Sequence, residues 1–427
     1  MPITKRYVSA FVISIAAVFC HGPAAQAQSQ EQLDWCNGKK DIATPDLGIG
    51  GCTAAIQSGK TTGKDLAVFF NNRGIHHKNK GEYDRAIQDY NQALKIDPQY
   101  ALSFNNRGNA YNSKGQHDRA IQDYDQAIKI NPQYASAFFN RGNTYNSKGQ
   151  HDRAIQDYDQ AIKINPQSAN AFLNRGVVYN SKGQFDRAIQ DYDQAIKLEP
   201  SAVLFTNRGV AYNSKGQFDR AIQDYDQAIK LDPNYADAFT NRGVAWVNKK
   251  DYDHAIADYS EAIRLNPNSA LAFTNRGSAW SNKKDYDRAV ADYTEAIRLK
   301  GNDAFADLIG RASVYRESGN FSAALDDLER AKMLIASYRG SDPSPRMTYY
   351  FNKGRTLHAM GNYDAAIAAF SAGMPEQPDY YWVYYNRALS YEKTGQRDKT
   401  VEDLKTLATH TEQKNWSEEI KAKLAQY

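Results

Sequence analysis

The 427-residue chain has little excess charge of either sign: 53 Lys and Arg stand against 49 Asp and Glu, a net charge of +4. This balance gives no indication of a nucleic-acid partner or of a polybasic membrane-binding patch. Cysteine is scarce, and neither Cys36 nor Cys52 has the CxxC spacing or the neighbouring histidine expected of redox or metal chemistry. We therefore expect no nucleic-acid partner and no metal site.

Sequence motifs of catalysis are missing as well. The chain contains no Walker loop, Rossmann glycine fingerprint, nucleophile elbow or HExxH pair. His117 and His151 occupy a position that holds Tyr83, Phe185 or Tyr252 elsewhere, and alternation with aromatic residues is typical of a packing position. Aspartates are numerous but recur at fixed spacing, as on a solvated or ion-paired face. We therefore expect a protein that is not an enzyme and has no cofactor.

What the sequence does contain is a repeat. The segment from Asn105 to Pro132, NNRGNAYNSKGQHDRAIQDYDQAIKINP, recurs with few changes up to residue 303. The glycine of its Asn-Arg-Gly triplet returns at intervals of 33 or 34 residues, at Gly74, Gly108, Gly142, Gly176, Gly209, Gly243 and Gly277. A unit of this length cannot bury its apolar face alone and must stack on copies of itself, so an elongated all-α solenoid is predicted.

Each copy is expected to contain two helices, which we name helix A and helix B. In the second copy, apolar residues three or four apart predict helix A around Phe104–Tyr111 and helix B around Ala120–Ile128. Gly115 can adopt a positive φ and end helix A, and Pro132 ends helix B. Gly108 lies inside helix A at a cost of about 1 kcal/mol relative to alanine. This repeated cost predicts that helices A and B cross too closely for a Cβ.

The second copy resembles the tetratricopeptide repeat signature in its order of Phe104, Gly108, Tyr111, Ala120, Tyr124, Ala127 and Pro132. Copies across about residues 67–303 agree with this signature in both period and residue type. The resemblance implies a superhelical solenoid of antiparallel helix pairs with terminal caps. It also implies that the helix-A face lines a concave groove that binds other proteins.

Weaker copies follow the regular ones. An eighth begins near Phe305, and a ninth and tenth fill residues 347–414, which gives about ten repeats. Residues 337–346 contain GSDPSP and have the composition of an inserted loop. We therefore expect repeats one to eight at 67–336, the inserted loop, repeats nine and ten, and a C-terminal capping helix at 415–427.

The first 27 residues differ from the rest of the chain. Lys5 and Arg6 form a short basic region, residues 8–19 an apolar region, and residues 25–27, Ala-Gln-Ala, a small-x-small cleavage site. This is the pattern of a secretory signal peptide, too short for a comfortable membrane span. We expect an exported chain, most simply periplasmic, with secretion or association with the cell envelope as alternatives and no stable membrane insertion after cleavage. A retained anchor is the other reading of the segment.

Residues 28–66 are expected to form an N-terminal helical cap. Cys20 leaves with the signal, and the two cysteines that stay, Cys36 and Cys52, most simply pair in an oxidising compartment. The bridge closes a loop of about 17 residues, worth about 3 kcal/mol in the chain-entropy model. One short helix is predicted to begin at residue 33 and a second at Thr44-Pro45, an N-cap followed by proline at the first helical position.

A polar pair recurs with the period. An arginine precedes each glycine of the triplet, and an aspartate follows sixteen residues later, as in Arg175 and Asp191. The weaker copies keep the linkage or, with Lys353 and Ala369 in the ninth, lose both partners together. We interpret the pair as a partly buried ion pair between helices A and B. A row of ligand-binding arginines is the alternative.

The residue before each arginine is asparagine, except in the eighth copy, which has Gly310. These asparagines, the ladder asparagines, are Asn72, Asn106, Asn140, Asn174, Asn207, Asn241, Asn275, Asn352 and Asn386. In the long tetratricopeptide array of the enzyme that attaches N-acetylglucosamine to Ser and Thr, asparagines at matching positions grip peptide backbone. The resemblance implies the same role here, and an amide suits it because it both donates and accepts. Alternatively, the asparagine solvates the groove or bonds a neighbouring helix.

Residues beside the ladder vary and are expected to set selectivity. Asn109 and Asn143 give way to Val177, Val210 and Val244, and Phe139 and Leu173 give way to Thr206, Thr240 and Thr274. Near the C-terminus, Phe351, Trp382 and Tyr385 fall in groove registers, where they could seat an apolar side chain or stack on a sugar ring. Packing under the inserted loop is the alternative for these aromatic residues.

These features together predict a non-catalytic scaffold or adaptor that binds an extended peptide segment of a partner protein in the groove. The alternative function is a cell-envelope carbohydrate- or peptidoglycan-binding protein that uses the C-terminal aromatic residues. The sequence predicts neither the identity of the partner nor the oligomeric state.

Overall fold

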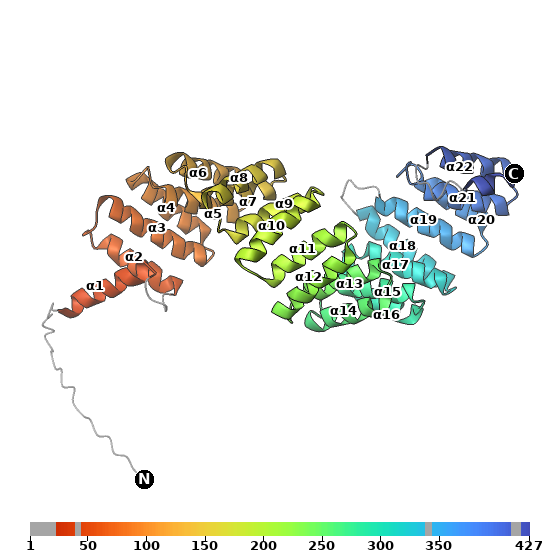
Figure 1. The fold of residues 1–427 in the computed structure, drawn as a ribbon, viewed down its shortest axis with the longest axis horizontal. Helices are drawn as coiled ribbons and strands as arrows, with labels where there is room; N and C mark the ends of the chain where they lie inside the picture. The colour runs from red at the N-terminus through yellow and green to blue at the C-terminus, as the bar shows by residue number, and fades with distance from the viewer. Residues whose placement is uncertain (1–22, 39–43, 338–343, 411–419) are drawn as a thin grey trace, which may run out of the picture. The chain divides into compact units, whose positions relative to one another are not determined.

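The structure is a computed structural model that describes residues 23–38, 44–337, 344–410 and 420–427. Within these ranges the chain consists of helices and short connections, and it contains no strand. The chain divides into two units, Met1–Lys182 and Gly183–Tyr427, which are described separately (Figure 1). Of the predicted signal peptide, residues 1–22 lie outside the described residues.

Unit 1 is a stack of helices that pack in pairs along the chain (Figure 1). Its helices are α1 (Pro23–Cys36), α2 (Pro45–Gln57), α3 (Gly63–Asn79), α4 (Tyr83–Ile96), α5 (Ala101–Ser113), α6 (His117–Ile130), α7 (Ala135–Ser147), α8 (His151–Ile164) and α9 (Ala169–Ser181). From α3 onward the odd-numbered helices correspond to helix A of the repeat and the even-numbered ones to helix B.

Unit 2 continues the alternation of helices A and B. Its helices are α10 (Phe185–Leu198), α11 (Ala202–Ser214), α12 (Phe218–Leu231), α13 (Ala236–Asn248), α14 (Tyr252–Leu265), α15 (Ala270–Asn282), α16 (Tyr286–Lys300), the 3₁₀ turn η1 (Gly301–Asp303), α17 (Phe305–Glu317), α18 (Phe321–Ser337), α19 (Ser344–Ala359), α20 (Tyr363–Gly373), α21 (Trp382–Lys393) and α22 (Arg397–His410). In chain order, α3 to α22 supply the ten predicted pairs. The all-α class with stacked helix pairs is confirmed.

The glycine that ends helix A is present as predicted in most repeats and is replaced in two of them. Gly115 has a φ of +71° just after α5, as expected of a glycine that stops helix A. In the sixth and seventh repeats the same place is occupied by Lys250 and Lys284, each with a φ of +63°. A side chain in this left-handed region costs about 1–2 kcal/mol, so these two turns are strained where the others are not.

The glycine of the triplet is required by a tyrosine on helix B. A Cβ on Gly108 would lie 2.7 Å from Cε1 of Tyr124, and one on Gly243 would lie 2.6 Å from Cε1 of Tyr259. Both rings are almost fully buried. The predicted close crossing is therefore confirmed, and the atoms nearest to the added Cβ belong to the tyrosine ring.

The weaker repeats show that glycine and tyrosine change together. Where Ala312 and Ala388 replace the glycine, Leu328 and Leu404 stand sixteen residues later in place of the tyrosine, and all four are buried. A leucine lacks the ring edge that reaches the helix-A backbone, so a methyl group fits there. The ninth repeat keeps Gly354, and there an aromatic ring, Phe370, again lies within 2.4 Å of the place a Cβ would take.

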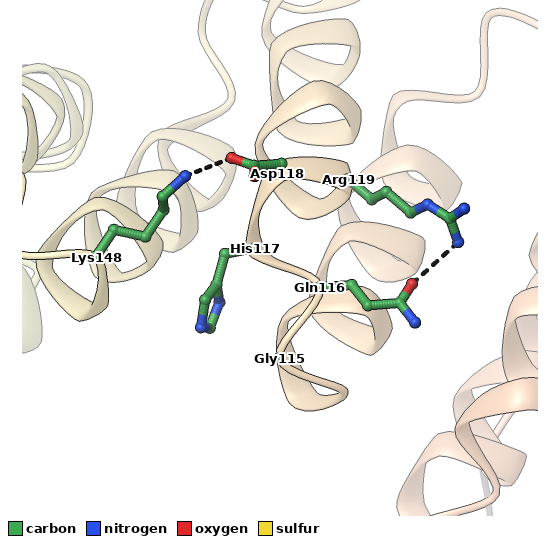
Figure 2. A pocket seen from close by; sticks show the side chains of 6 residues that line it. All are labelled: Gly115, Gln116, His117, Asp118, Arg119 and Lys148. Atoms are coloured by element: carbon green, nitrogen blue, oxygen red, sulfur yellow. Dashed lines mark hydrogen bonds and ion pairs between the residues drawn. The ribbon is translucent and has the colours of Figure 1, made fainter.

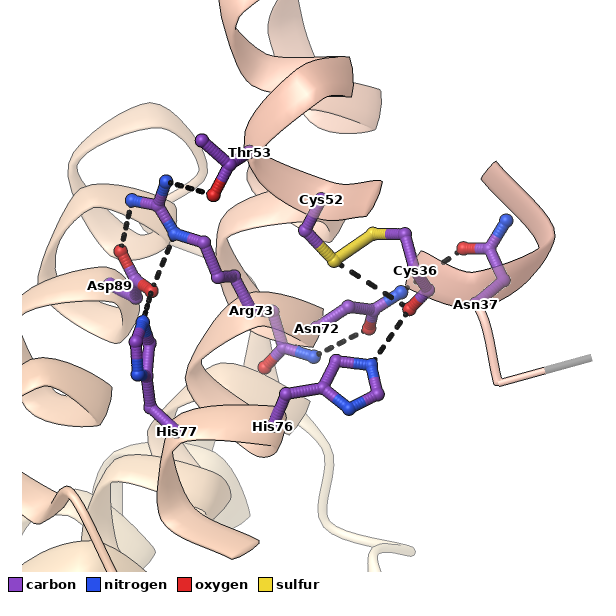
Figure 3. Close-up of a disulfide and its surroundings, with 10 residues drawn as sticks. Cys36, Asn37, Cys52, Thr53, Asn72, Arg73, His76, His77 and Asp89 are labelled. Carbon is purple, nitrogen blue, oxygen red and sulfur yellow. Dashed lines mark hydrogen bonds and ion pairs between the residues drawn. A yellow bond between two sulfur atoms is a disulfide. The ribbon is translucent and has the colours of Figure 1, made fainter. Parts of the chain in front are cut away.

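The predicted N-terminal cap is a helix pair closed by the predicted disulfide between Cys36 and Cys52 (Figure 3). The two cysteines are sixteen positions apart, the same spacing as the glycine and tyrosine of a repeat. Thr44 caps α2 as expected, because its hydroxyl accepts from the Leu47 backbone N–H. α1 differs from the prediction: it already runs from Pro23 and ends at Cys36, whereas a helix beginning at residue 33 was expected.

The α2 helix takes the place of a helix B against the first repeat. A Cβ on Gly48 would lie 2.3 Å from the His76 ring, so α2 approaches α3 closely. Asp46 accepts from Lys80 at 2.5 Å and Thr53 accepts from Arg73 at 3.2 Å, which are the contacts a preceding repeat makes elsewhere in the chain. The predicted start of the first repeat, residue 67, lies inside α3, because this helix begins four residues earlier at Gly63.

Two further predicted segments, the inserted loop and the capping helix, lie near the C-terminus. α18 ends at Ser337 and α19 begins at Ser344, so the ends of the predicted inserted loop, 337–346, are helical. The rest of that loop, 338–343, lies outside the described residues. Of the predicted C-terminal capping helix, 415–427, residues 415–419 also lie outside them, and residues 420–424 are helical.

Candidate functional site

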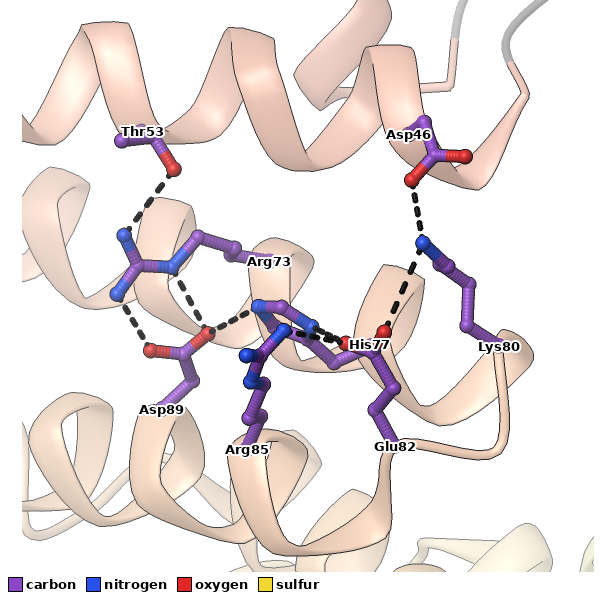
Figure 4. Close-up of polar contacts among 8 residues, drawn as sticks. All are labelled: Asp46, Thr53, Arg73, His77, Lys80, Glu82, Arg85 and Asp89. Atoms are coloured by element: carbon purple, nitrogen blue, oxygen red, sulfur yellow. Dashed lines mark hydrogen bonds and ion pairs between the residues drawn. The ribbon is translucent and has the colours of Figure 1, made fainter.

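The arginine of each triplet binds the aspartate sixteen residues later at two points. Arg73 Nε lies 2.9 Å from Asp89 Oδ2, and its Nη2 lies 2.6 Å from Oδ1 (Figure 4). Pairs of the same geometry are Arg107–Asp123, Arg141–Asp157, Arg208–Asp224, Arg242–Asp258, Arg276–Asp292, Arg311–Asp327 and Arg387–Asp403. The predicted ion pair between helices A and B is confirmed in these repeats. In the ninth repeat Lys353 instead binds Glu329 of α18 at 2.6 Å.

The same arginines also reach the preceding helix B, a contact that the sequence analysis missed. Nη1 of Arg107 donates to Asn91 at 2.6 Å, and Nη1 of Arg242 donates to Asp226 at 2.5 Å. The acceptors elsewhere are Thr53, Asp125, Asp159, Asp193, Ser260, Thr294 and Ser371. The sequence does contain a signal for this contact, because a polar residue stands two positions after every paired aspartate. In the repeats with a described ion pair, the arginine thus joins its own helix A to the following helix B and to the preceding one.

Burial makes these ion pairs obligatory. Burial raises the pKa of Asp258 above its ordinary value, although the hydrogen bonds from Arg242 act in the opposite direction. The pKa values of Asp123 and Asp224 are raised for the same reason. The arginine provides the main stabilisation of the charged carboxylate, and its removal would leave a buried charge without its hydrogen-bonded partner.

The ladder asparagines of unit 1 are bound to neighbouring helices. Nδ2 of Asn106 donates to Oδ1 of Asn71 on α3 at 3.1 Å, and Nδ2 of Asn140 donates to Oδ1 of Asn105 on α5 at 2.9 Å. Asn174 donates in the same way to Oδ1 of Asn143 at 2.8 Å. Here the amide joins one helix A to the one before it, which is the alternative role considered for the ladder.

Asn72 extends these amide bonds into the cap. Its Nδ2 donates to Oδ1 of Asn37 at 3.1 Å, and its own Oδ1 accepts from Asn71 at 3.3 Å (Figure 3). The amides of the first repeat are therefore engaged on both sides, by α3 itself and by the turn that follows α1.

Three ladder asparagines of unit 2 bond within their own helices. Nδ2 of Asn207 donates to the Val203 carbonyl at 2.9 Å, and Nδ2 of Asn241 donates to the Asp237 carbonyl at 2.8 Å, four residues back on the same helix. Asn386 does the same on α21. Those carbonyls already serve as helix acceptors, so an incoming donor or acceptor can displace the amide at small cost. Asn275 is half-buried on α15.

The ninth and eighth repeats depart from this pattern. Asn352 is buried, and its Oδ1 accepts from Ser313 at 3.0 Å and from Arg316 at 3.3 Å. At Gly310, where the asparagine is missing, a Cβ would lie 2.7 Å from the ring of Tyr293. The ring explains why the ladder is interrupted at this repeat.

Some of the residues predicted to set selectivity instead contact neighbouring side chains or are buried. Asn109 and Asn143 accept hydrogen bonds from the hydroxyls of Tyr124 and Tyr158 at 2.8 and 2.7 Å. Thr206 and Thr240 are buried, whereas Phe139, Leu173, Val210, Val244 and Thr274 are half-buried. The aliphatic residues that do reach solvent beside the ladder are Leu102, Val177, Val203 and Leu271.

The C-terminal aromatic residues divide in the same way. Phe351 packs against Phe370 and Tyr380, with ring centroids 6.2 and 5.2 Å apart, and belongs to a core cluster. Trp382 is 46% exposed at the start of α21, and Tyr385 is half-buried. Of the three predicted aromatic contacts, Trp382 is the one most exposed to solvent.

Hollows in the surface recur with the repeat. One of about 430 Å³ is lined by Gly115, Gln116, His117, Asp118, Arg119 and Lys148, at the turn between α5 and α6 (Figure 2). Lys148 binds Asp118, and Arg119 donates to Gln116 at 3.1 Å, so the polar groups bind one another. Equivalent hollows lie at Gly216 and Gly183. Such periodic hollows follow from helix stacking.

Neither a metal-binding cluster nor a membrane-spanning helix occurs in the part of the chain that the structure describes. There, no group of three or more His, Cys, Asp or Glu side chains is placed to hold a metal ion. No helix in the same residues is long and apolar enough to cross a membrane. His117 and His151 are half-buried and bond Asn112 and Asn146, as expected of a packing position.

Comparison with family models gives the class of the protein. A model described as "TPR repeat" matches residues 77–112, 108–149, 142–183 and 209–249. Two models described as "Tetratricopeptide repeat" match residues 169–201 and 236–269, and residues 270–303 and 348–374. Together these matches cover more than half of the chain, and the chain belongs to the tetratricopeptide repeat family. The repeats support a role as a protein-interaction scaffold.

The chain is also similar to solved structures of other proteins. The yeast protein Tom70 is 14% identical over 94% of this chain and 95% of that chain, with a TM-score of 0.50. The APC/C hetero-tetramer Cut9–Hcn1 is 16% identical over 95% of this chain and 87% of that chain, with a TM-score of 0.48. YrrB, described as a TPR protein with an unusual peptide-binding site, is 24% identical over 43% of this chain and 95% of that chain, with a TM-score of 0.38. A search of curated proteins finds no match.

Proposed function

We propose that the chain is a non-catalytic scaffold that binds an extended peptide segment of a partner protein along the ladder asparagines. The observation that carries the proposal is the state of Asn207 and Asn241, whose amides bond only to carbonyls of their own helices. An amide in this state can exchange its bond for one to a peptide N–H or C=O, because neither helix packing nor a second side chain depends on it.

Unit 2 is therefore the proposed binding region. Asn207, Asn241 and Asn275 stand on three successive A helices, α11, α13 and α15, at equivalent positions. An extended main chain presents a donor and an acceptor at every residue, and a row of amides can bond it without regard to sequence. Exposed Val203 and Leu271 beside the row would contact the side chains of the segment.

The ladder of unit 1 is proposed to stabilise the stack instead. Rotating Asn106 or Asn140 toward a peptide would break a bond to the neighbouring helix A, which offsets what the new bond contributes. Peptide binding at these repeats would thus be weaker than at Asn207 and Asn241.

The test is binding of a peptide library to the full chain and to an Asn207→Ala/Asn241→Ala variant. We expect the variant to lose most of the peptides that the unmodified chain retains, with at least a tenfold loss of affinity for each. A Gln190→Ala/Gln223→Ala variant, which removes two exposed amides from the B helices α10 and α12, is the matched control and should bind as before. Unchanged binding after removal of the ladder amides would sink the proposal.

A second function rests on Trp382. We propose carbohydrate binding, as in a cell-envelope glycan-binding protein, as the alternative, because this indole is 46% exposed and can stack on a sugar ring. Phe351 supports it less, since its ring packs inside a core cluster. Binding of solubilised peptidoglycan fragments that disappears in Trp382→Ala, but persists in Asn207→Ala/Asn241→Ala, would favour this function over peptide binding.

Export is proposed together with either function. The pattern of residues 1–27 and the buried Cys36–Cys52 disulfide, which needs an oxidising compartment to form, both support it. A periplasmic location is the simplest destination. Fractionation of cells that express the chain, followed by N-terminal sequencing of the mature form, tests the location and the cleavage after residue 27.

A further inference from the structure

Four of the B helices present the same four polar residues to solvent. On α6 all four are exposed, namely Arg119, Gln122, Gln126 and Lys129. Spacings of three, four and three residues place them on one side of the helix. The same four residue types stand exposed in the same places on α8 in unit 1 and on α10 and α12 in unit 2. We name each set an outer stripe, and its members run Arg-Gln-Gln-Lys along the helix.

The carboxylates of these helices are bound by cations of other helices. On α6 all three are engaged, in the pairs Asp118–Lys148, Asp123–Arg107 and Asp125–Arg141. On α8 the arrangement is the same, in the pairs Asp152–Lys182, Asp157–Arg141 and Asp159–Arg175. The hydrogen bond from Lys148 lowers the pKa of Asp118 below its ordinary value. The helix that carries an outer stripe therefore has no carboxylate left over for the cations of the stripe.

The cations of the stripes accordingly bond neutral groups or none. Nη1 of Arg119 donates to the Gln116 side chain at 3.1 Å, and the guanidinium lies 5.6 Å from the centroid of the Tyr111 ring. In the part of the chain that the structure describes, no ion pair is formed by the lysines that end the four stripes, Lys129, Lys163, Lys197 and Lys230. Ten residues separate the arginine of a stripe from its lysine, so each stripe presents two positive charges about 15 Å apart with two amides between them.

α14 and α16 show that the repeat can neutralise these positions. A glutamate replaces the second glutamine of the stripe, so Glu261 binds Arg264 at 2.6 Å. The hydrogen bond from Arg264 lowers the pKa of Glu261 below its ordinary value. On α16, Glu295 binds Arg298 in the same way at 2.6 Å. The packing of a helix pair therefore does not require the unpaired cations of the outer stripes.

We propose that the outer stripes bind an anionic polysaccharide. Its carboxylates would contact the arginine and the lysine of a stripe, because hydrogen bonds between ionised partners are the strong ones. Its hydroxyls would contact the two glutamines, because a side-chain amide both donates and accepts, as a hydroxyl does. The surface lies on the B helices and not on the A helices that carry the ladder, so the proposal goes beyond the proposed function and does not depend on it.

The composition of the stripes argues against other partners. A nucleic-acid strand carries a phosphate about every 3.4 Å, and proteins hold single strands by stacking bases on aromatic side chains. An outer stripe has its cations about 15 Å apart and contains no aromatic residue. It contains no apolar residue either, whereas helices that bind a membrane surface insert an apolar face and protein interfaces bury apolar residues at their centre.

The test measures binding of a fluorescein-labelled oligomer of galacturonic acid to the full chain by anisotropy. The oligomer's methyl ester, which has the same sugars without the charges, and a single-stranded oligonucleotide of equal charge are the comparison probes. We expect the acidic oligomer to bind at least tenfold more tightly than either, and its affinity to fall as salt is raised. No binding of the acidic oligomer, or equal affinity for its methyl ester, would overturn the proposal. An oligonucleotide that binds as tightly as the acidic oligomer would overturn the assignment to a polysaccharide.

Lysine variants separate the stripes from the net charge. Replacing the lysines that end the four stripes by glutamine should weaken binding of the acidic oligomer at least tenfold. The matched control replaces by glutamine the four lysines that bond the first aspartate of the same helices, Lys148, Lys182, Lys215 and Lys249. The control changes the net charge equally and should weaken binding about threefold or less. Equal losses in the two variants would assign the binding to net charge and contradict a role for the stripes.

A gain of affinity provides a test that misfolding cannot imitate. Glu261→Gln/Glu295→Gln releases the arginines of α14 and α16 and makes both helices more like an outer stripe, so affinity for the acidic oligomer should rise several-fold. Glu317→Gln/Glu402→Gln, at two exposed positions outside the B helices with stripes, changes the net charge equally and should have a much smaller effect. No gain, or the same gain in both variants, would count against the stripes. The library experiment with Asn207→Ala/Asn241→Ala tests the ladder independently of these results.

Discussion

The Asn-Arg-Gly triplet can be compared between α5 and α7 of unit 1 and α11 and α13 of unit 2. In both regions the arginine pairs with its aspartate and the glycine faces a tyrosine ring. The asparagine differs: Asn106 and Asn140 bond an amide on another helix, whereas Asn207 and Asn241 bond only their own helices. The difference depends on the acceptor that the preceding helix A offers, since Asn71 and Asn105 supply the amide oxygens in unit 1.

The difference teaches that identical residues in a repeat array need not have identical roles. In unit 2 the residue before the triplet asparagine is Thr206 or Thr240, which is buried and has no amide oxygen to offer the next helix. For Asn241, the preceding repeat has Thr206 at the position from which Asn71 bonds Asn106, and Val210 at the position from which Asn143 bonds Asn174, and neither residue has an amide oxygen. The residue in the preceding repeat, and not the ladder asparagine itself, therefore determines whether the asparagine bonds another helix.

The largest effect is expected where the two regions agree. Arg242→Leu leaves Asp258 buried and unpaired, so the free energy of unfolding should fall by about 3–5 kcal/mol. The double variant Arg242→Leu/Asp258→Ala should fall by less than the single one, because no buried charge stays behind. Urea unfolding followed by circular dichroism measures both, and strictly additive losses would contradict the ion pair. Arg107 and Asp123 should give the same result in unit 1.

A smaller effect is expected at the glycine. Gly243→Ala places a Cβ against the Tyr259 ring and should cost about 1–3 kcal/mol through overpacking. Gly243→Ala/Tyr259→Leu copies the pair that Ala312 and Leu328 form in the eighth repeat, and it should recover part of that loss. The same unfolding experiment checks the pair, and a double variant less stable than Gly243→Ala alone would contradict the coupling.

The asparagines themselves are expected to differ in stability. Asn106→Ala removes a hydrogen bond between α5 and α3 and should cost about 1 kcal/mol, whereas Asn207→Ala removes only a bond to its own helix and should cost close to nothing. Equal losses at the two positions would remove the distinction between the units.

The smallest effect concerns the strained turns. Lys250 has a φ of +63°, and Lys250→Gly should raise the free energy of unfolding by about 1 kcal/mol or less. Lys250→Ala is the matched control, since it removes the same side chain without relieving the backbone, and it should not stabilise. If Lys250→Ala raised the free energy of unfolding as much as Lys250→Gly, the destabilisation would come from the lysine side chain and not from the backbone conformation.

Much of the fold was predictable because the repeats provide an internal comparison within one sequence. The period, the two helices, the glycine stop at Gly115 and the arginine–aspartate pairs all recur, so each is supported several times over. Helix α1 was predicted less well, because its residues 23–36 occur only once in the chain and offer no internal comparison. The tyrosine ring as the partner of Gly108 was missed because spacing alone does not show how far a side chain reaches.

The candidate site was less predictable than the fold. The ladder positions follow from the period, but what each amide bonds depends on the residue one helix away, as with Asn71 for Asn106. The lack of a carboxylate for Lys129 was not visible in the sequence, because Asp125 stands four residues before it, which is the spacing of a helical ion pair. The structure shows that Asp125 instead binds Arg141 on the next helix A.

The central claim is that peptide binding belongs to the ladder of unit 2 and not to that of unit 1. The most direct measurement compares the affinity of one library-selected peptide for Asn207→Ala/Asn241→Ala and for Asn106→Ala/Asn140→Ala, each full length and folded. We predict a loss of at least tenfold for the first pair and less than twofold for the second. Equal losses for the two pairs, or a larger loss for the second, would contradict the account.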